Sequence, residues 1–242
     1  MLLSDAERGH PTLSSTRWSV VIAAQQADAP ESREALAGLY QKYWPPLYWY
    51  IRRRGSSVEE AQDLIQEFFT RLMEKNYLGY AHQEGCKFRS FLLASFKHFL
   101  ANEWDFSQAQ KRGGGVPSVC FDATALESRV AGLSHDVTPE KLYERKWALT
   151  VLEHVIESVR EEYRAAGKER LFEGLKPTLT GEKGKIPYQQ YATDLDMSEG
   201  AVKVAVHRLR RRYRQLLKEE IAQTVATPDE IEEEIKYLLS CL

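Results

Sequence analysis

Apolar side chains recur at intervals of three and four residues along most of the chain, and this spacing limits the possible folds more than any other feature. Positions three and four apart lie on one face of an α-helix, so such a run predicts a helix with one buried side. No segment shows the alternation of apolar and polar residues that indicates a β-strand. We therefore expect an all-α fold. One such run contains Leu36, Leu39, Tyr40, Tyr43, Leu47, Tyr50 and Ile51.

Three helices of this kind are predicted in the first half of the chain, at 31–54, 58–73 and 88–104. Pro45 and Pro46 lie inside the first, and they predict a break or a kink there because proline has no backbone N–H to donate. The connections between the three helices are short. The pattern therefore favours a compact bundle of the three-helix type.

A glycine-rich and proline-rich segment, 111–139, follows this bundle. It includes three consecutive glycines and has weak periodicity, as a flexible linker does. We therefore expect two helical domains joined by a flexible linker. The predicted divisions are an N-terminal extension at 1–30, the bundle at 31–112, the linker at 113–139, a second domain at 140–225 and an acidic C-terminal helix at 226–242.

The second domain is predicted to start with a long helix at 140–164, followed by a polar loop at 175–187. Two helices then follow each other closely, at 188–195 and 198–224, and the turn Asp196-Met197 separates them. A short helix, a tight turn and a longer helix form a helix-turn-helix. The second helix of such a unit commonly enters the major groove of DNA.

This second helix carries the most concentrated basic charge of a chain whose net charge is −2. Val202, Val206 and Leu209 form its buried side, and the small Gly200 would let its first turn approach base edges closely. Cationic side chains farther along can contact phosphates. The predicted DNA-binding residues are Ser198, Glu199, Gly200, Lys203, Val204, His207, Arg208 and Arg211.

Two other interpretations of this helix stay open. An arginine-rich amphipathic helix can be a solvated surface, and helix-turn-helix units also serve as protein interaction modules. The turn and the short helix before it favour DNA binding. The alternatives for the whole chain are a helix-turn-helix regulator that acts without polymerase and a helical protein-interaction adaptor.

Composition excludes several classes of protein. With 43% hydrophobic and 28% charged residues, the chain has the composition of a soluble globular protein. No apolar run approaches the roughly 20 residues of a membrane helix, and no secretory signal is apparent, so we expect a cytoplasmic protein. Cys86, Cys120 and Cys241 lack metal-ligand spacing and are expected to be reduced thiols. No catalytic, cofactor or metal motif is persuasive, which predicts a protein that is not an enzyme.

Short motifs in both halves of the chain resemble those of bacterial sigma factors of the extracytoplasmic-function group, in the sigma-70 superfamily. The family's D-x-x-Q-E-x-F and F-R-x-[WF]-L motifs have counterparts in the first domain, and its Y-x-x-[IY]-A and S-x-G-x-V-K motifs have counterparts in the second. The resemblance covers about three quarters of the chain, in the family's order. The matching residues are Asp63, Gln66, Glu67, Phe68 or Phe69, Phe88, Arg89, Phe91, Leu92, Tyr188, Tyr191, Ala192, Ser198, Gly200, Val202 and Lys203.

The resemblance implies that the first domain, sigma region 2, binds core RNA polymerase through its beta and beta-prime subunits. The implied contact residues are Asp63, Gln66, Glu67, Phe68 and Arg71. It also implies that the third helix and the loop after it open the minus-ten promoter element and hold an unstacked base. The groups available for this are Lys97, His98, Asn102, Trp104, Lys111 and Arg112.

The helix-turn-helix would then be sigma region 4, which reads the minus-thirty-five element of promoter DNA. An anti-sigma protein is a further candidate partner, and no membrane insertion is expected. The chain departs from the family in its long loop at 175–187, in a hint of an extra helix at 12–28 and in its acidic tail. The tail could pack on region 4, mask its basic surface or stay solvated. We favour packing because Ile231, Ile235, Leu238 and Leu239 give it an apolar side.

Overall fold

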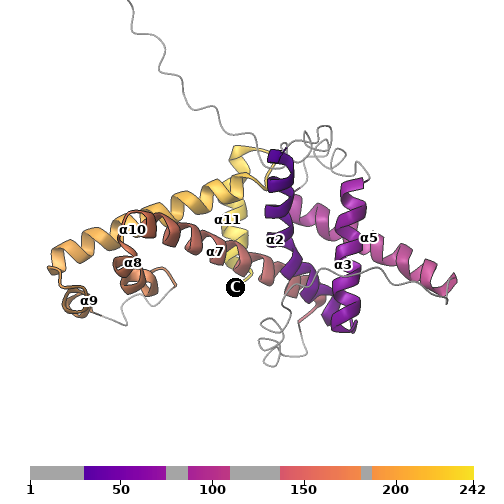
Figure 1. Cartoon of the computed structure of the whole chain (residues 1–242), viewed down its shortest axis with the longest axis horizontal. Coiled ribbons are helices and arrows are strands. Elements are labelled where there is room, and N and C mark those ends of the chain that lie inside the picture. Colours follow the sequence, from indigo (N-terminus) through magenta and orange to yellow (C-terminus); the bar gives the residue numbers. More distant parts are fainter. Residues whose placement is uncertain (1–29, 75–86, 110–136, 181–186) are drawn as a thin grey trace, which may run out of the picture.

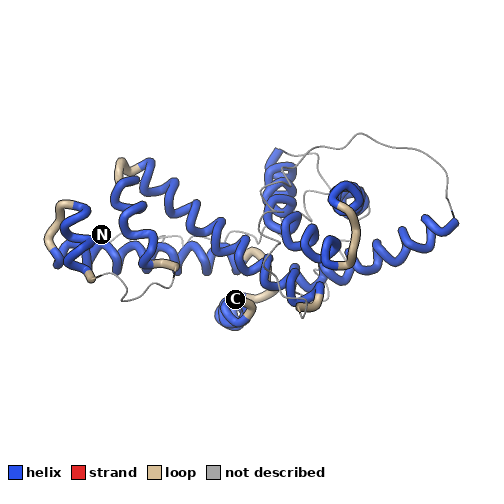
Figure 2. Tube along the Cα trace, turned by 90° about the horizontal axis from the view of Figure 1, so that it is seen from below, coloured by secondary structure: helices blue, strands red, loops and turns tan. Residues whose placement is uncertain are grey.

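The described residues form α-helices joined by turns, with no strand among them (Figure 2). This confirms the expected all-α fold. No helix in this described part is long and apolar enough to cross a membrane. The predicted extra helix at 12–28 and nearly all of the linker lie outside the described residues. The structure is a computed structural model that describes residues 30–74, 87–109, 137–180 and 187–242.

The first half of the chain forms the N-terminal bundle, which consists of α2 (Pro30–Arg53), α3 (Val58–Glu74) and α5 (Phe88–Ala109). Helix α2 continues through Pro45 and Pro46, so the structure excludes the break that the two prolines suggested. The backbone angle of proline suits a helix, and buried neighbours such as Trp44 and Leu47 hold the segment by packing.

In the second half of the chain, a long helix lies beside the segment predicted to be a helix-turn-helix. In Figure 1, α7 and α10 run side by side away from the N-terminal bundle, and α8 and α9 lie at their far end. The predicted loop at 175–187 is helical at its start, because Phe172 and Leu175 are buried and hold that segment. The elements are α7 (Pro139–Ala165), α8 (Glu169–Leu175), η1 (Lys176–Thr178), α9 (Tyr188–Leu195), α10 (Glu199–Ala222), η2 (Pro228–Glu230) and α11 (Ile231–Ser240).

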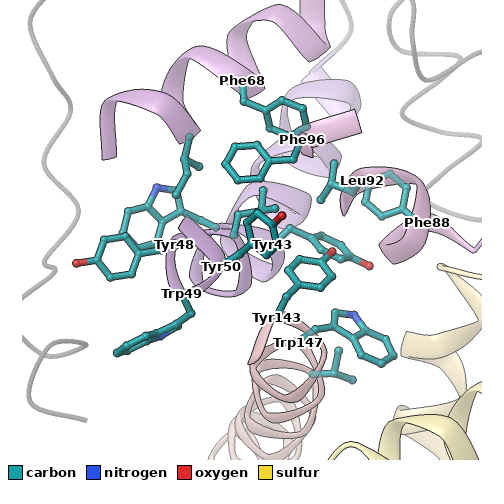
Figure 3. Packing of buried hydrophobic residues seen from close by; sticks show 14 of the residues in the cluster. Tyr43, Tyr48, Trp49, Tyr50, Phe68, Phe88, Leu92, Phe96, Tyr143 and Trp147 are labelled. Atoms are coloured by element: carbon teal, nitrogen blue, oxygen red, sulfur yellow. The ribbon is translucent and has the colours of Figure 1, made fainter. Parts of the chain in front are cut away.

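The core of the N-terminal bundle continues into the second half of the chain. Figure 3 shows Tyr143 and Trp147 of α7 among the aromatic residues of the bundle, and both are at most 1% exposed. The Tyr143 hydroxyl donates to the carbonyl oxygen of Arg89 at 3.0 Å. The two-domain division stays a prediction, and in this structure the two halves share one hydrophobic cluster.

The acidic C-terminal helix α11 packs against the rest of the molecule, as the apolar pattern favoured. Leu238 is fully buried, and Ile231 and Ile235 are half-buried. Leu239 had been expected on the same side but is 55% exposed, because it lies one position beyond the buried face. The helix contacts both α10 and α7.

Candidate nucleic-acid and partner interfaces

The segment predicted to be a helix-turn-helix consists of α9, a tight turn and α10. Asp196 has a left-handed backbone, with φ of 53°, and the N–H of Met197 donates to the carbonyl of Ala192 at 2.9 Å. The hydroxyl of Ser198 accepts from the N–H of Ala201 at 3.2 Å and so caps α10. Local sequence signals therefore place the turn and the start of α10 as predicted.

A small apolar core holds α10 in place. Val202, Val206 and Leu209 are at most 2% exposed, and they share a cluster with residues of α7, α8 and α9. Gly174 of α8 lets α9 approach, since a β-carbon there would lie 2.7 Å from a methyl carbon of Leu195. The outer face of α10 is thus fixed by packing on three other helices.

Every predicted DNA-binding residue of α10 lies on this outer, exposed face. A β-carbon added at Gly200 would meet nothing within 4 Å, so the protein's own packing does not require a glycine there. Val204 is 50% exposed, which is unusual for a valine in this structure. The exposed set comprises Ser198, Glu199, Gly200, Lys203, Val204, His207, Arg208 and Arg211.

Part of this face borders a surface groove of about 670 Å³ between α10 and the end of α7. Gly200, Val204, Arg208 and Arg211 line one side, and Lys168 lies in the same groove. Lys203 is engaged differently, because its ammonium pairs with Glu199 at 2.6 Å. The hydrogen bond to Glu199 raises the pKa of Lys203 above its ordinary value, which keeps that side chain charged.

The arginines of α10 divide into two kinds, and the sequence did not distinguish them. Arg210 donates to the carbonyl of Thr178 at 3.1 Å, and Arg212 donates to Glu162 at 2.8 Å. These two tie α10 to neighbouring segments. Arg208 and Arg211 are instead exposed in the groove. Helical position alone gives no signal for such contacts, since the partners lie more than 30 residues away in the chain.

The residues predicted to contact polymerase lie on α3. Asp63 and Glu67 are exposed and Gln66 is half-buried. Arg71 is held by Glu67 at 2.7 Å and by Glu103 of α5 at 2.6 Å.

Phe68 is the exception in this set, because it is only 3% exposed and packs edge-on against Phe96 of α5, with ring centroids 5.0 Å apart. We therefore assign Phe68 to the core instead of the surface. The helical position of Phe68 beside Ile65 and Leu72 could have indicated this.

The residues predicted to contact the minus-ten element separate onto two faces of α5. Lys97 borders a cleft of about 730 Å³ that also contains Asp63 and Arg54. His98 and Asn102 border a smaller apolar pocket of about 380 Å³. That pocket is further lined by Phe68, Arg71, Leu72, Phe91, Ala94, Ser95 and Phe99.

Three residues predicted for the minus-ten element, Lys97, His98 and Asn102, therefore adjoin residues predicted to contact polymerase. The side chains of the other three lie outside the described part of the chain. Trp104 lies in α5, but its side chain is outside the described part. Lys111 and Arg112 lie outside the described residues altogether.

Lys97 is also paired with the second half of the chain. Its ammonium lies 2.6 Å from a carboxylate oxygen of Glu140 in the first turn of α7. This hydrogen bond raises the pKa of Lys97 and lowers that of Glu140. A residue expected to bind DNA is thus engaged by a carboxylate of its own chain.

The F-R pair at the start of α5 has partners that the sequence did not predict. Arg89 is 7% exposed, and its Nε donates to Glu234 of α11 at 2.5 Å. Burial raises the pKa of Glu234, but Arg89 and Lys87 more than offset this and hold it below its ordinary value. The buried carboxylate therefore stays ionised at neutral pH.

Comparison with protein families gives a match in the N-terminal bundle. Residues 39–105 match the family model of sigma-70 region 2. The match supports a sigma factor of the sigma-70 family, with a role in transcription initiation. That family implies core RNA polymerase and promoter DNA as partners. Neither the curated proteins nor the solved structures give a match. The N-terminal bundle is called region 2 below.

Proposed function

We propose that the chain is an extracytoplasmic-function sigma factor that binds core RNA polymerase and directs initiation at promoters with minus-ten and minus-thirty-five elements. One observation carries the proposal: a segment matching sigma-70 region 2 occurs in the same chain as a helix-turn-helix whose predicted base-contacting face is fully exposed. A regulator that acts without polymerase would need only the second of these.

The polar face of α3 is the proposed polymerase contact. Asp63 and Glu67 point away from the core, while Ile65 and Phe68 fix the helix by burial. Such a helix presents its carboxylates on a rigid support, which favours binding to a complementary basic surface. The proposed partner surface lies on the beta and beta-prime subunits.

The apolar pocket beside His98 is the proposed place for an unstacked base of the minus-ten element. Phe91 and Phe99 offer aromatic surface, and Arg71 and Asn102 offer donors. Single-stranded nucleic acid is commonly bound by stacking on aromatic rings beside cations. Lys97 would contact the backbone nearby once it is released from Glu140.

The first three turns of α10 are the proposed reader of the minus-thirty-five element. Gly200 permits close approach to the base edges, and Arg208 can form a bidentate pair with guanine. Arg211 and Lys168 border the same groove and are placed to contact phosphates.

The test is reconstitution with core RNA polymerase, followed by transcription from the promoter of the chain's own operon and from a genomic library. Asp63→Ala should weaken binding to core polymerase at least tenfold, whereas Glu59→Ala, an exposed carboxylate on the same helix, should leave it unchanged. Arg208→Ala should leave polymerase binding intact and weaken recognition of the minus-thirty-five element. Arg145→Ala, an exposed arginine on α7, is the matched control.

Two results would contradict the proposal. One is failure of the chain to bind core polymerase at any salt concentration. The other is equal loss of duplex DNA binding in Asp63→Ala and Arg208→Ala, because the proposal assigns these residues to different partners.

A further inference from the structure

The acidic helix α11 makes a specific set of contacts with region 2. Glu234 is 1% exposed and accepts from Arg89 at 2.5 Å, and its other oxygen lies 2.8 Å from the ammonium of Lys87. The N–H of Phe88 donates to the carbonyl of Thr224, just before α11, at 3.1 Å. The start of α5 is therefore joined to the C-terminal segment by both backbone and side chains.

Glu234 and Tyr237, the two residues of α11 shown in contact with Arg89, lie on one face of the helix. Tyr237 lies three residues after Glu234, and the guanidinium of Arg89 stacks over its ring at 4.0 Å. Leu238, four residues after Glu234, is fully buried. Residues three and four apart share a helix face. Glu232 and Glu233 are exposed and are oriented elsewhere. The place of a glutamate on the helix, and not its charge alone, therefore decides which one binds Arg89.

Several ion pairs between region 2 and the second half of the chain, among the described residues, share one polarity. Region 2 supplies the cation and the second half supplies the carboxylate in each of the following pairs: Lys42–Glu220, Lys87–Glu234, Arg89–Glu234, Arg89–Glu144 and Lys97–Glu140. These cations of region 2 are therefore paired with carboxylates from α7, α10 and α11 of the same chain.

The same contacts fix the separation of the two proposed DNA-binding sites. Helix α7 has 27 residues and is about 40 Å long. Its first turn contacts Lys97, and its last turn lies in the groove with Gly200. Promoter elements about 25 base pairs apart are about 85 Å apart along straight duplex DNA. The described arrangement thus spans about half of the distance that both elements require.

We propose that α11 is an intramolecular clasp, which binds Lys87 and Arg89 of region 2 through Glu234 and Tyr237 and, together with the packing of α7 on α2, holds the chain in a closed form unable to bind both promoter elements. The inference rests on the proposed function. Release of α11 lets region 2 and the helix-turn-helix separate on core polymerase. Buried ion pairs add little net stability, but they can select one conformation over another, which is the role assigned to Arg89 and Glu234.

The test measures the distance between spin labels at Ser90→Cys on α5 and Ala165→Cys at the end of α7, both exposed positions, in a full chain whose native cysteines are replaced. Double electron–electron resonance on the free chain should give one narrow distribution. Glu234→Gln should add a population at distances longer by tens of ångströms. Glu232→Gln, an exposed glutamate of the same helix that pairs with Lys218, should match the parent chain.

Core polymerase gives a second measurement. If only open molecules bind core polymerase, the apparent affinity is the affinity of the open form multiplied by the fraction of molecules that are open. Glu234→Gln raises that fraction, so it should bind core polymerase at least fivefold more tightly than the parent chain. Bound to polymerase, all the chains should show the long distance. Should Glu234→Gln not fold, as judged by circular dichroism, Lys87→Ala provides the test, because it removes one cation from Glu234 and leaves Arg89 in place.

An unchanged narrow distribution together with unchanged polymerase affinity in a folded Glu234→Gln chain would overturn the clasp. A short label distance that persists in the polymerase complex would do the same. If the parent chain does not bind polymerase at all, the proposed function fails, whereas the comparison of free chains still decides whether α11 holds the two halves together.

Discussion

Basic residues are used in opposite ways at the two ends of this molecule. On α10, Arg208 and Arg211 are exposed along a groove, on a face that packing leaves outward. At the start of α5, Lys87 and Arg89 are engaged by a buried glutamate from the far end of the chain. The sequence shows cations in both places. The difference shows that positive charge alone does not identify a DNA contact, because the fold decides which cations are buried against carboxylates of the same chain.

The largest expected effect comes from breaking the buried pair. Arg89→Ala leaves Glu234, at 1% exposure, without its main partner, and loss of one member of a buried ion pair costs about 3–5 kcal/mol. Urea unfolding followed by circular dichroism measures the change in the free energy of unfolding. Arg145→Ala is exposed on α7 and should change it by about 0.5 kcal/mol at most. Equal effects of the two substitutions would show that the pair with Glu234 is not a structural contact.

The next prediction compares two arginines on one helix. Arg208→Ala should weaken binding to the minus-thirty-five element by about 1–3 kcal/mol and leave stability unchanged, since Arg208 is exposed. Arg210→Ala should instead lower stability by about 1.5–3 kcal/mol, because it loses its hydrogen bonds to the carbonyl of Thr178. Fluorescence anisotropy with duplex DNA and thermal unfolding separate the two effects. A reversed order would mean that the exposed face of α10 is not the reading face.

The start and the buried side of α10 could be read from local sequence. Ser198 caps the helix, and the spacing of Val202, Val206 and Leu209 gave its buried side. These features depend on residues within one or two helical turns, and pattern analysis detects such relations. The predicted DNA-binding face of α10 is exposed for the same reason, because it consists of the residues opposite the buried side, which the spacing predicted correctly.

Contacts between distant segments were beyond the sequence. Glu234 lies 145 residues from Arg89, and nothing in the acidic run of the tail distinguishes it from Glu232 or Glu233. The burial of Phe68 could have been inferred from its spacing with Ile65 and Leu72. The contact of Arg210 with Thr178 could not, because a charge pattern does not show what packs against it. Only the three-dimensional arrangement decides these cases.

A smaller effect is expected at Val204, the exposed apolar residue among the cations of α10. An apolar side chain in the major groove can contact the methyl group of thymine. Val204→Ala should therefore reduce affinity by about 0.8 kcal/mol, or about fourfold, at one thymine position. Thymine is replaced by uracil, which lacks the methyl group, at each position of a selected duplex in turn. At the contacted position, the losses of binding free energy from Val204→Ala and from uracil should be less than additive. Full additivity at every thymine would exclude the contact.

The smallest expected effect comes from an exposed pair on the same helix, which contrasts with the buried pair of α11. Arg212 donates to Glu162 at 2.8 Å, but Glu162 is 41% exposed, so solvent screening limits the pair to about 0–1 kcal/mol.

The hydrogen bond from Arg212 lowers the pKa of Glu162, and a lowered folded-state pKa stabilises the protein at neutral pH. That contribution is lost as the pH falls below the ordinary glutamate value of about 4.3. Glu162→Gln should thus differ slightly from the parent chain in urea unfolding at pH 7, and the difference should shrink as the pH falls from about 4.3 toward the lowered pKa of Glu162. A difference of several kcal/mol at pH 7 would show that exposure does not separate the two kinds of pair, and the contrast between α10 and the start of α5 would then need another cause.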